Sequence, residues 1–238
     1  MSSEFKRTGS PELRADAARA DMSYFREPKD RLRDMVAAEV AAKPFSELTS
    51  ITYDHEGSEL AGHVLLDALE EEGFGLDDFD AVGALTAAAI PLACAMLHAA
   101  ASRGQDLDAF VMDFVYPSIQ GPSIKGKRVI LLDAWLSEKS YVQTSSLVTL
   151  RHGNELSLDF SIVENEGASV AAVAALVGGV DSAQGERPVV HVVDTVTDAA
   201  SDLPFVEVFH ESDLRAEAGS ADSADSDDSA DSDDQSTK

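Results

Sequence analysis

A run of four apolar residues that ends in an acid, Val129-Ile130-Leu131-Leu132-Asp133, constrains the fold more than any other stretch of the chain. A strand that is apolar at successive positions has both faces buried, as the strands of parallel sheets do. In such sheets, ligands bind outside the carboxyl ends of the strands. The run therefore predicts a central parallel strand, with Asp133 at the edge where a ligand would bind.

The segments around this run alternate between helical and strand patterns. Apolar residues three and four positions apart predict helices over residues 31–42, 59–71 and 90–101, with Pro91 tolerated in a first turn. Residues 138–153 and the alanine-rich residues 169–180 predict two more helices. Strands are predicted over residues 79–85, 109–116 and 155–165, a short one over 50–53, and late edge strands over 188–196 and 205–209. This order predicts an α/β fold, with a parallel, doubly wound sheet and helices on both faces.

Charge and sequence complexity divide the chain into three segments. Residues 1–28 are polar with little apolar periodicity, so they are predicted to be disordered. Residues 211–238 hold ten acidic residues against two basic ones, and their repeat SADSADSDDSADSDD cannot bury enough apolar area to fold. They are predicted to form an acidic disordered tail. One folded domain, residues 29–210, remains between them.

The acidic composition restricts the partners and suggests an environment. The formal net charge is −26, with 44 acidic and 18 basic residues, so most of the surface would repel nucleic acid. The chain has more aspartate than glutamate residues (26 against 18) and more arginine than lysine residues (11 against 7). This composition is typical of proteins from salt-rich cytoplasm. The composition therefore predicts a halophilic protein of haloarchaeal origin. In molar salt the electrostatic screening length falls to about 3 Å, so most of the repulsion among the carboxylates of the chain is cancelled.

The chain has few residues for a disulfide, a zinc site or a membrane span. Cys94 is the single cysteine, which excludes an internal disulfide and leaves too few soft ligands for zinc. The longest apolar stretch, residues 81–101, is interrupted by Thr86, Pro91 and His98, and the N-terminus has no apolar signal core. The sequence predicts no metal site, no membrane association and a cytoplasmic location.

Four segments in this order resemble the type I phosphoribosyltransferases, and among them the orotate phosphoribosyltransferases. VGALTAAAIPLA (82–93) resembles the pyrophosphate loop and the helix after it, and GKRVILLDAW (126–135) the strand that enters the phosphoribosyl pyrophosphate motif. SYVQTSSLVTLRHG (140–153) resembles the following helix, and SIVENEG (161–167) a strand-to-turn segment. The resemblance covers roughly residues 30–180. It implies the phosphoribosyltransferase type I fold and a homodimer.

The chain departs from the family in its ligand elements. The family motif has two adjacent acids for the ribose hydroxyls and a glycine-containing loop whose amides hold the 5′-phosphate. Asp133 matches the first acid, but Ala134 replaces the second. Residues 137–141, Ser-Glu-Lys-Ser-Tyr, contain no glycine to let the backbone approach a phosphate. At the pyrophosphate loop, Thr86 is followed by Ala87 and two more alanines where the family has glycines.

A third element, the flexible loop that carries lysine and histidine in orotate enzymes, is also different. Between the strands at 109–116 and 129–132 the chain has only PSIQGPSIKGK (117–127), without a Lys-x-His-Gly pattern. The three departures together predict that transferase chemistry has been lost while the scaffold remains.

The favoured interpretation is a phosphoribosyltransferase-fold protein without transferase activity, acting as a regulatory, ligand-binding or assembly protein. It assigns no catalytic residue. Its vestigial ligand site, for phosphoribosyl pyrophosphate or a nucleotide, comprises Thr86, Ala87, Asp133, Ser137, Lys139, Ser140 and Tyr141. Trp135 either stacks on a ligand or packs in the core. The alternative is an active orotate- or purine-type transferase that needs Mg²⁺ and uses Ser137 and Lys139 as an unusual phosphate site. A hydrolase using Ser140 or Cys94 has no recognisable motif.

Overall fold

The computed structural model describes residues 26–43, 46–137, 150–151, 155–158, 161–180, 182, 187–194 and 200–217. The strands within these residues are β1 (Ala81–Ala84), β2 (Asp108–Asp113), β3 (Ser118–Gln120), β4 (Arg128–Leu136), β5 (Leu150–Arg151), β6 (Glu155–Leu158), β7 (Ser169–Gly178), β8 (Val189–Asp194) and β9 (Ala200–His210). They form one sheet in the order β3-β2-β1-β4-β7-β9-β8-β6-β5. The pairs from β2 through β1, β4 and β7 to β9 are parallel, which confirms the predicted α/β fold with a parallel central sheet.

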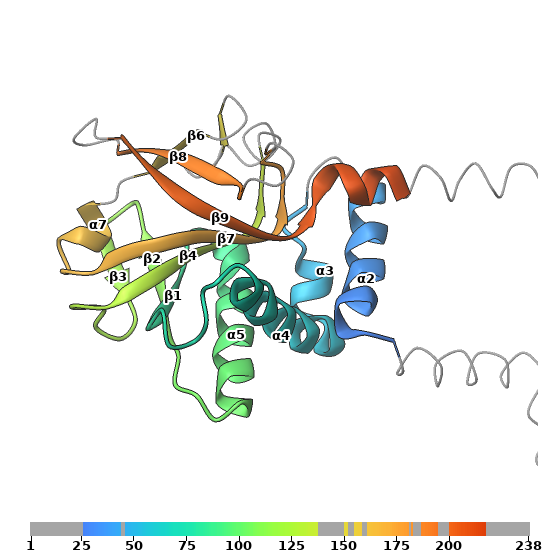
Figure 1. Ribbon diagram of the computed structural model, residues 1–238, viewed down its shortest axis with the longest axis horizontal. Helices are drawn as coiled ribbons and strands as arrows, with labels where there is room; N and C mark the ends of the chain where they lie inside the picture. Colours follow the sequence, from blue (N-terminus) through green and yellow to red (C-terminus); the bar gives the residue numbers. More distant parts are fainter. Residues whose placement is uncertain are drawn as a thin grey trace, which may run out of the picture.

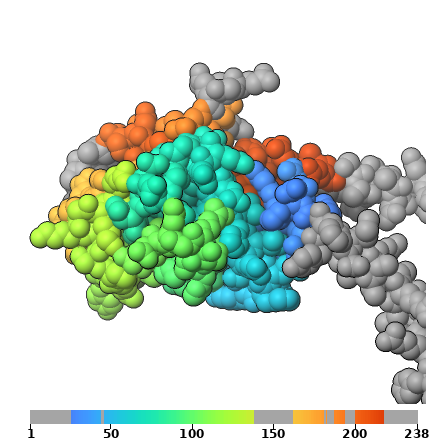
Figure 2. All heavy atoms as spheres, turned by 60° about the horizontal axis from the view of Figure 1, so that its bottom comes forward, coloured from blue at the N-terminus to red at the C-terminus, as the bar shows by residue number. Residues whose placement is uncertain are grey.

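Helices cover one face of the central strands. They are α2 (Pro28–Ala42), α3 (Thr49–Thr52), α4 (His55–Glu71) and α5 (Ile90–Ser102), which follows the short 3-10 turn η1 (Ala87–Ala89). Figures 1 and 2 show α4 and α5 lying side by side over the sheet, with α2 beyond them. The two helices are in close contact at Gly62, where an added Cβ would lie 2.5 Å from the carbonyl oxygen of Ala95. The short α7 (Ser161–Glu164) adds Ile162 and Val163 to the core on the other face.

The local sequence explains where the long helices begin. The Asp54 carboxylate accepts hydrogen bonds from the backbone N–H groups of Glu56 and Gly57, so α4 starts earlier than its apolar periodicity indicates. Pro91 lies in the first turn of α5, as predicted, because the amide that proline lacks would have no partner inside the helix there.

The strand register places the carboxyl ends of β1, β2 and β4 at one edge of the sheet. Ala84, the last residue of β1, lies opposite Leu132 in β4 and opposite Val111 in β2. Asp133 is therefore one residue beyond the end of β1, and it pairs with Ala175 of β7 on its other side. The chain leaving β1 turns through Thr86 into η1 at this same edge.

The alanine-rich segment predicted as a helix is instead strand β7. Alanine favours helices, but this segment lies between β4 and β9 and pairs in parallel with both. Residues Ala172 to Val177 are buried, at 0% exposure, and small side chains suit a strand that is covered on both faces. Tertiary pairing therefore overrides the helix propensity of alanine.

Other predicted elements also differ. The strand expected over residues 50–53 is the helical turn α3, and the strand expected over 155–165 stops at Leu158 and is followed by α7. The helix expected over 138–153 lies mostly outside the described residues, but Leu150–Arg151 at its end is strand β5. Neither late strand is at an edge, because β9 lies between β7 and β8, and β8 lies between β9 and β6. The loop predicted after β2 contains a short antiparallel strand, β3.

The folded domain extends past the predicted boundary at residue 210. Residues 211–217 are helical, and Leu214 is 0% exposed. This segment begins directly after β9 and packs beside α2 (Figure 1). Among the described residues, none of the helices is long and apolar enough to cross a membrane.

Candidate functional site

A pocket of about 370 Å³ opens at the carboxyl ends of β1 and β2, beside the start of α5. This is the edge at which parallel sheets bind ligands. We call it the β1–β2 pocket, and its lining residues are Leu85, Thr86, Ala87, Ile90, Val111, Met112, Asp113, Phe114, Val115 and Gln120. Seven of these ten side chains are apolar, and none is a lysine, an arginine or a histidine.

Asp133 lies behind the wall of the pocket rather than in it. Its side chain is 4% exposed, and Thr86 Oγ1 donates a 2.6 Å hydrogen bond to Asp133 Oδ1. The backbone N–H of Ala134 donates to the same oxygen at 2.7 Å. Burial raises the pKa of Asp133 to about 6, against the opposing effect of these two hydrogen bonds, and the charge of Glu47 adds to the rise. The carboxylate thus positions Thr86.

Asp113 is the one charged side chain in the pocket lining, and it organises the turn after β2. Its Oδ1 accepts hydrogen bonds from the backbone N–H groups of Val115 (2.9 Å) and Tyr116 (3.0 Å). Its Oδ2 accepts one from Gln120 Nε2, at 2.9 Å. The bond from the Tyr116 amide is the largest of the effects that hold the pKa of Asp113 below its usual value, so this carboxylate stays ionised at neutral pH.

Strand β4 continues past Asp133 to the point at which a phosphate-binding loop would begin. Trp135 and Leu136 pair with Val177 and Gly178 of β7, and the exposure of residues 134–137 is between 0% and 3%. Ser137 packs so closely on the chain after β7 that a Cβ at Gly179 would lie 2.9 Å from the Ser137 Cβ. Ser137 therefore packs in the interior, away from solvent and from the pocket lining.

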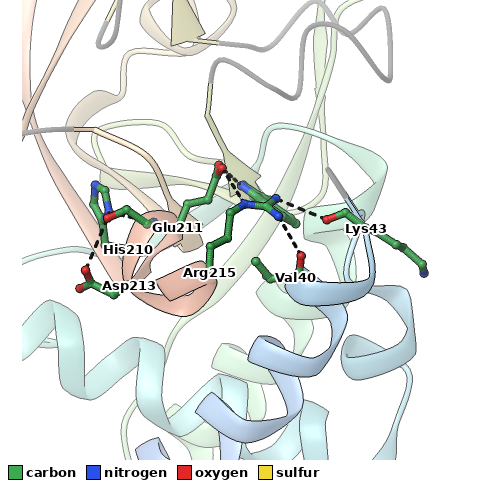
Figure 3. Close-up of polar contacts among 8 residues, drawn as sticks. Val40, Lys43, His210, Glu211, Asp213 and Arg215 are labelled. Carbon is green, nitrogen blue, oxygen red and sulfur yellow. Dashed lines mark hydrogen bonds and ion pairs between the residues drawn. The ribbon is translucent and has the colours of Figure 1, made fainter. Parts of the chain in front are cut away.

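Trp135 is a core residue held by the helix at 211–217. It is 1% exposed, and its Nε1–H donates a 3.1 Å hydrogen bond to Glu211 Oε2. Arg215 Nε donates to Glu211 Oε1 at 3.2 Å, and the guanidinium lies 5.7 Å from the centre of the Trp135 ring. Figure 3 shows Arg215 also donating to two backbone carbonyls, that of Val40 near the end of α2 (3.0 Å) and that of Lys43 directly after the helix (3.3 Å). The interpretation of Trp135 as core packing is confirmed.

The structure brings only part of the predicted site together. Thr86 and Ala87 line the pocket, Asp133 supports it from behind, and Ser137 is buried elsewhere. Lys139, Ser140 and Tyr141 lie outside the described residues. The sequence interpretation missed Asp113 and Gln120. An acid at the end of a strand followed by a turn could have pointed to Asp113, whereas Gln120 gave no signal.

The described residues do not fit a Mg²⁺ ion. Magnesium takes octahedral oxygen ligands and is usually held by one or two accessible carboxylates together with the phosphates of a substrate. Asp133 is buried against Thr86, and Asp113 already accepts three hydrogen bonds. No group of three or more histidine, cysteine, aspartate or glutamate side chains in the described part of the chain could hold a metal ion.

Comparisons with known proteins place the chain among phosphoribosyltransferases. It is 45% identical over 95 residues to orotate phosphoribosyltransferase of Streptomyces avermitilis, covering 37% of this chain and 50% of the relative. It is 37% identical over 139 residues to the Streptomyces coelicolor protein of the same name, covering 56% and 66%. The chain thus spans half to about two thirds of the length of these relatives. No family model matches it.

Solved structures share the fold. The orotate phosphoribosyltransferase of Mycobacterium tuberculosis H37Rv, in complex with inorganic phosphate, superposes with a TM-score of 0.54 at 21% identity, covering 81% of this chain and 94% of that one. A phosphoribosyltransferase from Corynebacterium diphtheriae gives a TM-score of 0.50 at 22% identity, covering 79% and 98%. At these identities the likeness concerns the fold alone.

Proposed function

Because the chain belongs to the type I phosphoribosyltransferase family, we propose that it keeps a pocket at the ligand-binding edge of that fold but neither binds phosphoribosyl pyrophosphate nor transfers phosphoribose. It acts instead as a ligand-binding protein, with a regulatory or assembly role toward its partners. The observation that carries this proposal is the course of β4, which continues as a buried, paired strand from Asp133 to Leu136. Positions 133 and 134, which by resemblance would carry the two acids for the ribose hydroxyls, are therefore both buried.

The pocket lining supports the same proposal. Phosphoribosyl pyrophosphate carries several negative charges, which transferases must neutralise with cations, amides or a metal ion. Among the described lining residues, the one charged group is the carboxylate of Asp113. Asp133, the acid that would hold ribose hydroxyls, is 4% exposed and bonded to Thr86.

A second candidate function, an active orotate phosphoribosyltransferase, is favoured by the names of the relatives from two Streptomyces species. In this case the phosphate site would have to be completed by residues beyond Ser137, with Lys139 as the cation. The two candidates differ in whether phosphoribosyl pyrophosphate binds at all, so a binding measurement separates them.

Isothermal titration with phosphoribosyl pyrophosphate and Mg²⁺ tests the proposal. The full chain is used at the lowest KCl concentration at which circular dichroism shows it folded, with the Streptomyces coelicolor relative as a positive control. We expect no saturable heat up to about 1 mM, the upper end of ordinary enzyme KM values. Binding below 1 mM that Lys139→Met weakens and Lys29→Met, on α2, does not would favour the active enzyme.

A further inference from the structure

We propose that the β1–β2 pocket binds a small, mainly apolar molecule that carries a protonated amine. This inference rests on the proposed function, because it names the ligand class of the same site. It is carried by the hydrogen-bonding character of the three polar side chains in the pocket lining, Thr86, Asp113 and Gln120.

The polar side chains of the lining offer more acceptors than donors. The hydroxyl of Thr86 donates to Asp133, so only its lone pairs are available to a ligand. The amide of Gln120 donates one of its two N–H groups to Asp113, which leaves one donor and the two lone pairs of its oxygen. Asp113 itself is ionised and can only accept. These side chains therefore favour a ligand that donates hydrogen bonds, and they offer little to a phosphate or carboxylate.

The charge around the pocket also favours a cationic ligand over an anionic one. The carboxylate of Asp113 is not paired with any lysine, arginine or histidine in the lining, and the chain as a whole carries a formal charge of −26. A negative potential attracts cations and repels anions. Asp113 Oδ2 accepts a single hydrogen bond, from Gln120, so it has a lone pair left for an ammonium group. That contact would be a charge-assisted hydrogen bond, which is stronger than a neutral one.

The walls and the volume define the rest of the ligand. Ile90, Val111, Met112 and Phe114 contribute apolar surface, and 370 Å³ is at the lower end of the range for small-molecule sites. Ile90 is 37% exposed although it is a large apolar residue, which leaves it available to cover a ligand. The pocket thus suits a compact ring or short aliphatic body with one amine.

Three probes with the same ring and different charge test this inference, namely benzylamine, benzyl alcohol and benzoate. Inorganic phosphate is a fourth probe, for the backbone N–H groups at the start of η1. Binding is followed through the NMR signals of the methyl groups of Ile90 and Met112 in the full chain, at pH 7.5 and at the lowest KCl concentration that keeps it folded. We expect benzylamine to bind at least about tenfold more tightly than benzoate, the effect of one charge-assisted hydrogen bond.

Matched variants locate the site and its charge. Asp113→Asn keeps an oxygen to accept the Val115 and Tyr116 amides but removes the charge, so the preference for benzylamine over benzyl alcohol should disappear. Asp106→Asn, an exposed acid before β2, is the control for net charge. Ala87→Phe should fill the pocket and weaken every probe, whereas Ala101→Phe, exposed near the end of α5, should weaken none.

Tighter binding of benzoate or phosphate than of benzylamine would overturn the inference, and so would the absence of saturable binding for all four probes. Neither result bears on transfer of phosphoribose, which is measured separately. Conversely, saturable binding of phosphoribosyl pyrophosphate would overturn the proposed function even if the benzylamine preference were observed.

Discussion

At the residue scale, the acid that matches the family motif is buried. Asp133 occupies the sequence position that, by resemblance, would contact ribose hydroxyls, but its carboxylate is buried and bonded to Thr86. The sequence alone placed Asp133 in a buried strand, but the predicted end of that strand at Asp133 is wrong, because β4 continues to Leu136. Its burial could not be predicted, because it depends on how far β4 continues beside β7, and that pairing is not local.

The raised pKa of Asp133 makes a prediction about stability. The folded chain binds this proton more tightly than the unfolded chain, so the contribution of Asp133 to stability falls as pH rises from about 4 to 6 and changes no further above that window. A rise from 3.8 to about 6 corresponds to roughly 3 kcal/mol. Asp133→Asn should escape this loss, because the amide oxygen can still accept from Thr86 and Ala134.

Urea unfolding at several pH values between 4 and 7 measures this effect. The stability of Asp133→Asn relative to the original chain should rise by about 2 to 3 kcal/mol across the window. Asp106→Asn, which removes an exposed acid, should show no such trend. Parallel curves for Asp133→Asn and the original chain would mean that Asp133 titrates normally and is not buried as described.

At the element scale, the long amphipathic helices and strands β1, β2 and β4 followed from the sequence, whereas β7 and the helix at 211–217 did not. The apolar spacing that predicts α2, α4 and α5 is a local property of the sequence. Alanines at 171, 172, 174 and 175 fit either a helix or a doubly covered strand, and only their partners β4 and β9 decide between the two. In the C-terminal segment, the high proportion of acids predicts disorder, although one of its residues, Leu214, is buried in the folded chain.

The helix at 211–217 should be held mainly by Arg215. Arg215→Met would leave the carboxylate of Glu211 buried without this ion pair and would remove the hydrogen bonds to the carbonyls of Val40 and Lys43, at a cost of about 3 kcal/mol. Arg33→Met is the matched control, because Arg33 contacts Glu217 of the same helix in an exposed pair, and pairs of this kind contribute about 1 kcal/mol or less. Equal losses in thermal or urea unfolding would contradict the assigned role of Arg215.

At the scale of the whole molecule, the acidic end divides into a docked part and a remainder. Residues 211–217 contact α2 and β4, whereas residues 218–238 lie outside the described residues and contain seven aspartates and no large apolar side chain. A segment of that composition has no apolar face with which to dock. The two parts should therefore differ sharply in their contribution to stability.

Two truncations test this division. Removing residues 218–238 should change the thermal midpoint by no more than a few degrees, while removing residues 211–238 should lower it by about 10 °C or more, because Leu214 and Arg215 are lost with it. Circular dichroism melting of both chains in the same KCl buffer provides the comparison. A large loss from the shorter truncation would show that the terminal residues also pack on the domain.

Release of pyrophosphate from phosphoribosyl pyrophosphate in the presence of orotate and Mg²⁺ tests the central claim most directly. Loss of a single preorganised donor from a charge-stabilising site can cost about 10²–10³ in rate. The described pocket lining contains no cation, and the acid that would hold the ribose hydroxyls is buried. We expect no release above the rate without protein, under conditions in which the Streptomyces coelicolor relative turns over. Release at about 1 s⁻¹ or faster, abolished by Asp133→Asn, would contradict the claim and establish an active transferase.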